Sequence, residues 1–190
     1  MPARIVAFSG NTHRPSRTRT LVEAVAAELS RLRPIDLKLY DLVDAGTGIA
    51  VASRSALPLP AARIVEAIEK ADALIVGSPV YKGAYTGLFK HLFDLVDPTA
   101  LAGKPVAIVA TGGGARHALV VEHAFRPLFG FFGALQIPTA VYASDTDFSA
   151  GVLVAAGVRA RAAEAGGQLA ALLLHRAATA TGPAELAAAE

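Results

Sequence analysis

Apolar and polar positions along this chain follow two alternating patterns. Short apolar runs of strand length are each followed by a longer segment whose apolar residues recur at every third or fourth position, as on one face of a helix. Strands and helices are therefore predicted to alternate along the chain. The predicted strands are 5–8, 35–40, 73–77, 105–111 and 137–142, and the predicted helices are 18–32, 60–70, 87–96, 115–135 and 152–175.

This order predicts an α/β protein with a five-stranded, doubly wound parallel sheet between two layers of helices. Strand 35–40 alternates apolar and polar residues, so we expect it at an edge of the sheet. The flavodoxin-like strand order 2-1-3-4-5 suits five such strands, and it places a ligand cleft beyond the carboxyl ends of strands 1 and 3. We expect the domain to cover 1–175 and the Ala-rich segment 176–190 to form a disordered tail.

Three segments depart from this simple pattern. Residues 41–60 contain two glycines and two prolines without a clear period, which predicts a long surface loop with room for a short helix. Apolar residues nearly surround the predicted helix 87–96, so we expect another subunit to cover one of its faces. Pro127 lies inside the predicted helix 115–135, where it cannot donate a hydrogen bond to residue 123; it therefore predicts a kink or a π-bulge near His123.

The loop Ser9–Thr20 joins the first strand to the first helix and is rich in Ser, Thr, Asn and Arg. Free backbone N–H groups and the positive end of the helix dipole meet at such a helix N-terminus, which suits a phosphate group. Simple capping of the helix, with the arginines in solvent, is the alternative interpretation. The side chains that add donors are the hydroxyls of Ser16, Thr18 and Thr20 and the guanidinium groups of Arg14, Arg17 and Arg19.

Two further loops follow strands 3 and 4, and a parallel sheet places all three loops at the same rim. Pro79, Val80 and Tyr81 offer backbone edges and an aromatic face to a flat ring. The glycines of 112–114, after Thr111, expose backbone N–H groups that can stabilise negative charge on that ring, although an ordinary glycine turn is the alternative. A phosphate joined to a flat ring that gains negative charge describes FMN as it becomes reduced.

The composition of the chain and the motifs it lacks exclude several other classes of function. The formal charge of +2 is too small to favour nucleic acid or an anionic membrane, and the absence of cysteine excludes disulfides and thiolate chemistry. No apolar run is long enough to span a membrane and no signal segment is evident, so we expect a cytoplasmic protein. His117 and His123 do not share a helix face, and no metal site is expected. The chain also lacks a Walker A loop and a GxGxxG fingerprint.

The three loops resemble those of the NAD(P)H-dependent FMN reductase family. The family's phosphate loop, roughly Gly-Ser-x-Arg-x-x-Ser-x-Asn/Ser-x-x-Leu, is similar to residues 10–21, where Ser16 is retained and Asn11, His13 and Thr18 replace family residues. Its Pro-x-Tyr, Gly-x-Leu-Lys-x-x-x-Asp and Thr-Gly-Gly segments resemble 79–81, 87–94 and 111–113, and the similarity covers about 3–175. Within the family, the likeness is greatest to reductases of two-component alkanesulfonate and methanesulfonate monooxygenases.

The resemblance implies hydride transfer from NADH or NADPH to FMN, with FMN released as a substrate to a partner monooxygenase and no catalytic side chain. It also implies a homotetramer, because a Tyr or His in a π-bulge marks the tetramer interface of that subgroup and His123 fits this place. Two alternatives remain: a reductase of quinones, azo dyes or metal oxyanions with tightly bound FMN, and a flavodoxin-like electron carrier. The expected cofactor-binding residues are Asn11, His13, Ser16, Arg17, Thr18, Pro79, Val80, Tyr81, Thr111, Gly112, Gly113 and Gly114.

Overall fold

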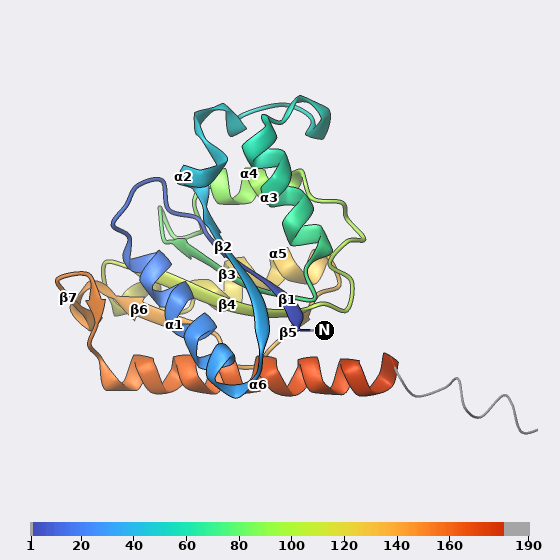
Figure 1. Ribbon diagram of the computed structural model, residues 1–190. Coiled ribbons are helices and arrows are strands. Elements are labelled where there is room, and N and C mark those ends of the chain that lie inside the picture. Colours follow the sequence, from blue (N-terminus) through green and yellow to red (C-terminus); the bar gives the residue numbers. More distant parts are fainter. Residues whose placement is uncertain (1, 181–190) are drawn as a thin grey trace, which may run out of the picture.

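A central parallel sheet organises the protein, of which a computed structural model describes residues 2–180, with side chains as far as Arg176. The strand order is β2-β1-β3-β4, and β5 and β6 both pair with β4 (Figure 1). This confirms the flavodoxin-like order predicted from the sequence. The strands are β1 (Ala3–Ser9), β2 (Ile35–Asp41), β3 (Ala73–Pro79), β4 (Pro105–Gly112), β5 (Leu135–Gln136) and β6 (Val141–Ser144).

The last predicted strand, 137–142, is wrong as a continuous element, because two short strands replace it. Pro138 has no N–H to donate to a ladder, and the next amide, Thr139 N, donates instead to Gln168 Oε1 at 2.9 Å. The Thr139 hydroxyl donates to Glu164. The chain therefore leaves β4 between β5 and β6 and bonds to the final helix over that interval.

Helices cover both faces of the sheet (Figure 1). Ile5 and Ala7 of β1 point into the core beneath one helical layer, whereas Val6 and Phe8 point into the core beneath the other, as the two-residue period of a strand requires. The first layer consists of α1 (Arg17–Leu32) and α6 (Ala156–Ala180), and the second contains α3 (Leu59–Lys70), α4 (Gly87–Asp94) and α5 (Arg126–Phe131).

Helix α4 packs into its own chain more completely than the sequence predicted. Phe89 and Phe93 are fully buried, and Phe89 stacks on Phe8 with the ring centroids 5.9 Å apart. Phe125 also packs against Phe89, with the ring centroids 5.6 Å apart. Only Leu88, at 37% exposure, leaves a sizeable apolar surface on this helix. The chain itself therefore provides most of the second cover that was expected from another subunit.

The predicted helix 115–135 is broken into three parts: a 3₁₀ turn at Ala115–His117, a π-helical turn at Val121–Phe125, and α5. Because Pro127 cannot donate to His123, the backbone widens, and the Arg126 N–H reaches back to the Val121 carbonyl. The expected π-bulge near His123 is therefore confirmed. The predicted end at residue 135 is wrong, since α5 stops at Phe131 and the chain turns into β5.

Two connections also contain regular structure. Residues 41–60 include the short helix for which the sequence left room, α2 (Leu42–Ala45), as well as two 3₁₀ turns. A small hairpin, β7 (Phe148–Ser149) and β8 (Val152–Leu153), precedes α6, which therefore begins at Ala156 and not at residue 152. Because α6 runs to Ala180, the predicted tail at 176–190 starts inside this helix, and its remainder, 181–190, lies outside the described residues. Within 2–180 no helix has the length and apolar character to cross a bilayer.

Candidate functional site

A cleft of about 480 Å³ opens at the carboxyl ends of β1, β3 and β4, the rim where the strand order predicts a ligand. All but one of the expected cofactor-binding residues line it; the exception is Gly114. Asp145 and Gly151 also line the cleft and were not expected there, although the polar run after β6 ends at the same rim and could have indicated Asp145. The expected residues in the wall are Asn11, His13, Ser16, Arg17, Thr18, Pro79, Val80, Tyr81, Thr111, Gly112 and Gly113.

The N-terminus of α1 opens onto this cleft. Ser16 is its N-cap residue, with extended backbone geometry, and its Oγ accepts a hydrogen bond from Arg19 N at 3.3 Å. The amides of Arg17 and Thr18 receive no cap from Ser16 and belong to the first turn, whose N–H groups have no partner inside the helix. The positive end of the helix dipole and these donors together favour an anion.

A pair of buried hydroxyl groups joins the first loop to β4. Thr18 Oγ1 lies 2.5 Å from Thr111 Oγ1, and both side chains are almost fully buried. The Thr18 hydroxyl therefore already has a protein partner. This bond fixes the first turn of α1 against the end of β4, so the two walls of the cleft keep a set separation.

Behind the first loop, the fully buried carboxylate of Asp41 collects three side chains. Arg14 Nε and Arg19 Nη1 each donate to its Oδ2 at 2.7 Å, and Asn11 Nδ2 donates to the same atom at 3.2 Å. Burial opposes ionisation of Asp41, but these hydrogen bonds outweigh it and hold the pKa of Asp41 below its usual value. Asp44 contacts Arg14 as well, at 2.6 Å.

This cluster corrects the expectation for two arginines. Arg14 and Arg19 were expected to offer their charges to a phosphate, but both are bound to Asp41. Sequence reasoning did not find this partner because Asp41 lies at the end of another strand. Asn11 also contributes differently from what was expected, since its amide nitrogen donates to Asp41 and to the His13 carbonyl at 2.9 Å. Its Oδ1 is buried and has no hydrogen-bond partner among the described residues, although Asn11 itself lines the cleft.

The second loop leaves β3 at Pro79 and runs along the cleft. Val80 N donates to the Thr111 carbonyl at 2.7 Å, which ties this loop to the third one. Tyr81 and Ala84 exchange backbone hydrogen bonds across a tight turn in which Lys82 and Gly83 both have positive φ. Tyr81 is 54% exposed at the cleft, where its ring offers an apolar face to a flat ligand.

The third loop brings bare backbone to the cleft. A Cβ on Gly112 would lie 2.6 Å from the Tyr142 hydroxyl, so this position has no room for a side chain. Tyr142 donates that hydroxyl to the Gly114 carbonyl at 2.7 Å and holds the glycine run in place, and burial raises the pKa of Tyr142. Gly113 faces open space, so its backbone is accessible to a ligand. Gly114 supports the loop through its carbonyl and is not part of the cleft wall.

The donor set fits FMN. A phosphate matches the α1 amides, the Ser16 hydroxyl and the Arg17 charge, and a flat ring matches the Tyr81 face and the bare Gly113 backbone. His123 lies outside the cleft wall, exposed in the π-helical turn. Residues 2–176 contain no cluster of three or more His, Cys, Asp or Glu side chains placed to hold a metal ion.

Comparison with known sequences agrees with this chemistry. The family described as NADPH-dependent FMN reductase matches residues 3–149. An FMN reductase (NADPH) of Pseudomonas aeruginosa PAO1 is 47% identical over 161 residues, which cover 84% of this chain and 87% of that protein. The NADH-dependent FMN reductase SfnF of Pseudomonas fluorescens Pf0-1 is 51% identical over 149 residues, which cover 78% of this chain and 80% of that protein.

Solved structures share the fold as well. An oxidoreductase from Corynebacterium diphtheriae superposes with a TM-score of 0.79 at 31% identity, covering 92% of this chain and 98% of that one. The apo form of an NADH:FMN oxidoreductase, EMOB, gives a TM-score of 0.74 at 28% identity, with 91% and 89% covered. The chain therefore belongs to the NADPH-dependent FMN reductase family, whose members use FMN and a reduced nicotinamide nucleotide.

Proposed function

We propose that this NAD(P)H-dependent FMN reductase treats FMN as a substrate that binds and leaves, and that it supplies reduced flavin to a partner monooxygenase in organosulfonate use. The observation that carries the first part is the cleft itself, where a helix N-terminus and bare glycine backbone meet but only one arginine of the first loop stays available. The likeness of 15–17, 78–82 and 110–113 to the reductases of sulfonate monooxygenases supports the second part.

In this proposal each wall of the cleft has one role. Ser16, Arg17 and the first-turn amides of α1 hold the phosphate. Tyr81 covers a face of the ring, and the backbone of Gly113 bonds to its edge. Bound FMN supplies the hydride acceptor, so the chain has to bind and orient the two cofactors and exclude water.

The first test measures NADH and NADPH oxidation with and without free FMN. We expect turnover that depends on added FMN and saturates with it. Turnover without added FMN, in the presence of a quinone, would show instead a flavoprotein that retains its cofactor. The phosphate site is tested with Ser16→Gly, which removes the hydroxyl while retaining a residue that N-cap positions tolerate.

We expect Ser16→Gly to weaken FMN binding by about 1 kcal/mol, close to fivefold, because one hydrogen bond to a charged phosphate is lost. Ser30→Ala is the matched control, since it removes a hydroxyl from the same helix outside the cleft. Equal FMN affinities for Ser16→Gly and the wild type would remove this hydroxyl from the site.

The link to a monooxygenase is tested by reconstitution. A two-component alkanesulfonate monooxygenase should release sulfite when this chain, NADH or NADPH, and FMN are its only source of reduced flavin. A failure to support sulfite release, while the chain itself reduces FMN, would restrict the proposal to flavin reduction. The cytoplasmic location expected from the sequence stays a prediction.

We also propose that the chain assembles into a homotetramer through the surface around the π-helical turn. Leu119 and Phe131, which flank this turn, are 71% and 73% exposed, and His123 is exposed between them in sequence. Large apolar side chains that are this exposed favour association. Sedimentation should give a tetramer for the wild type and a smaller species for Phe131→Lys; a wild-type monomer would contradict the proposal.

A further inference from the structure

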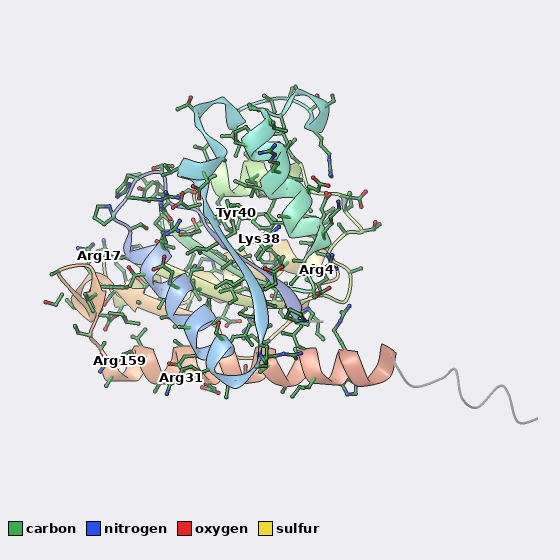
Figure 2. The ribbon with its side chains drawn as sticks, viewed as in Figure 1. Arg4, Arg17, Arg31, Lys38, Tyr40 and Arg159 are labelled. Carbon is green, nitrogen blue, oxygen red and sulfur yellow. The ribbon has the colours of Figure 1, made fainter. Side chains whose placement is uncertain are left out.

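Arg17 and Asp145 face each other across one side of the cleft. Arg17 Nη1 lies 2.8 Å from Asp145 Oδ1, and both residues line the cleft wall. Their side chains are 51% and 53% exposed. In Figure 2, Arg17 lies at the end of α1 nearest the β7 hairpin. The pair therefore connects the two segments that border the helix N-terminus.

Asp145 is held in place by its own turn. It begins the 3₁₀ turn Asp145–Asp147, where the Asp147 carboxylate accepts hydrogen bonds from the amide of Ser144 at 2.6 Å and from its hydroxyl at 2.8 Å. The Asp147 carbonyl accepts from Val154 N at 2.9 Å. The turn is thus anchored on both sides, and the Asp145 carboxylate forms a fixed negative charge at the cleft.

Arg17 is the arginine of the first loop that is left to a phosphate ligand. Arg14 and Arg19 are both bound to the buried carboxylate of Asp41, and they also pair with Asp44 and Glu23, so their charges are already compensated. Arg17 lines the cleft beside the first-turn amides of α1. Its partner Asp145 is an exposed carboxylate, and exposed ion pairs are weak enough to exchange one partner for another.

We propose that Asp145 keeps the affinity for FMN low, by competing with the FMN phosphate for Arg17 and by repelling its negative charge. This inference rests on the proposed function, because it gives a reason why FMN leaves as a substrate. When the phosphate enters, Arg17 turns from Asp145 towards it, and the released carboxylate is left beside a second anion. When FMN leaves, the ion pair forms again. Asp145 thus promotes the release of FMN, and it takes part in no chemical step.

The test compares two flavins that differ only in the phosphate. Flavin fluorescence gives the dissociation constants of FMN and riboflavin for the wild type and for Asp145→Asn. We expect Asp145→Asn to bind FMN about 3–10-fold more tightly at low salt, with a correspondingly slower dissociation rate and unchanged riboflavin affinity. The gain should fall as salt is added, because the screening length shrinks from about 10 Å at 0.1 M to about 3 Å at 1 M.

Two controls separate this effect from a general change in charge. Asp36→Asn makes the same change in net charge on an exposed residue of β2 outside the cleft, and it should leave FMN affinity unaltered. In the Arg17→Gln background, the gain from Asp145→Asn should shrink, because the competition for Arg17 is gone. An equal gain in both backgrounds would overturn the role of the ion pair.

The remaining outcomes also decide the question. Unchanged FMN affinity in Asp145→Asn, with wild-type circular dichroism, would overturn the inference, and so would an equal gain for riboflavin. If either of these results is found while the wild-type protein still binds FMN and oxidises NADH or NADPH, only the inference fails and the proposed function stands. Wild-type protein that neither quenches FMN fluorescence nor oxidises NADH or NADPH would contradict the proposed function and this inference together.

Discussion

The first loop presents arginines to two very different surroundings. On its inner side, Arg14 and Arg19 share the fully buried carboxylate of Asp41, which also receives the Asn11 amide. On its outer side, Arg17 pairs with Asp145 where half of each side chain remains in solvent. Arginines within one short segment, 14–19, therefore have two different roles: two of them pair with a buried carboxylate and one lines the cleft. The inner pairs share a fully buried carboxylate, although Arg14 itself is 42% exposed, and this burial makes them structural. Both partners of the outer pair are exposed, which keeps it exchangeable.

Asp41→Asn should disrupt the ion pairs on the inner side, and of the substitutions proposed it should lower the free energy of unfolding the most. The substitution leaves two guanidinium groups around a neutral amide, and breaking a buried pair in this way costs about 3 kcal/mol of unfolding free energy. Urea unfolding followed by circular dichroism measures this loss. Asp44→Asn is the comparison, since Asp44 also contacts Arg14 but is one-third exposed, and it should cost clearly less. Equal losses in the two variants would contradict the central place of Asp41.

Acid should remove the same contribution reversibly. Because the pKa of Asp41 is lowered in the folded state, its contribution to stability is fully present above its ordinary value of 3.8 and is lost as the pH falls through the folded value. The difference in unfolding free energy between wild type and Asp41→Asn should therefore stay constant near neutral pH and narrow below pH 3.8. A difference that stays constant down to pH 2 would contradict this assignment.

The buried hydroxyl pair of Thr18 and Thr111 should contribute less to stability than the Asp41 ion pairs. Thr111→Val leaves the Thr18 hydroxyl buried without its partner, which should cost about 1–2 kcal/mol in urea unfolding. The double variant Thr18→Val with Thr111→Val should recover much of this loss, because two apolar groups then face each other. If the double variant loses the sum of the two single effects, the hydroxyls do not act as a pair.

The outer side should contribute least to stability. Asp145→Asn and Arg17→Gln should each change the unfolding free energy by less than about 0.5 kcal/mol, since the pair is exposed and screened. The same variants are expected to change flavin binding, so stability and affinity are affected by opposite sides of one loop. A loss near that of Asp41→Asn would show that the outer pair is structural too.

The sheet order and the cleft position could be predicted because they follow from patterns that are local in sequence. Each apolar run sets one strand, and the alternation with helices determines a parallel arrangement. The π-helical turn was predictable for the same reason, since Pro127 acts on the residues next to it in the chain. The polar loops after β1, β3 and β4 then had to meet at one rim.

What could not be predicted depends on partners distant in sequence. The roles of Arg14 and Arg19 follow from Asp41, which reaches them only because β2 pairs with β1. The break after β5 depends on Gln168 of α6, which offers Thr139 an alternative acceptor. Asp145 reaches the cleft because β6 ends beside β4. No periodicity within one segment carries this information.

The close contact beneath the first loop also limits how this chain can vary in evolution. A Cβ added to Gly10 would lie 2.8 Å from a ring atom of Phe89 and 3.0 Å from Ser78 Oγ. Phe89 in turn fills the space between Phe8 and Phe125, so the ring has no room to move aside. A residue larger than glycine at position 10 therefore requires a smaller residue at position 89 and small shifts of the Phe89 Cβ and the Ser78 hydroxyl, and among homologues positions 10 and 89 should change together.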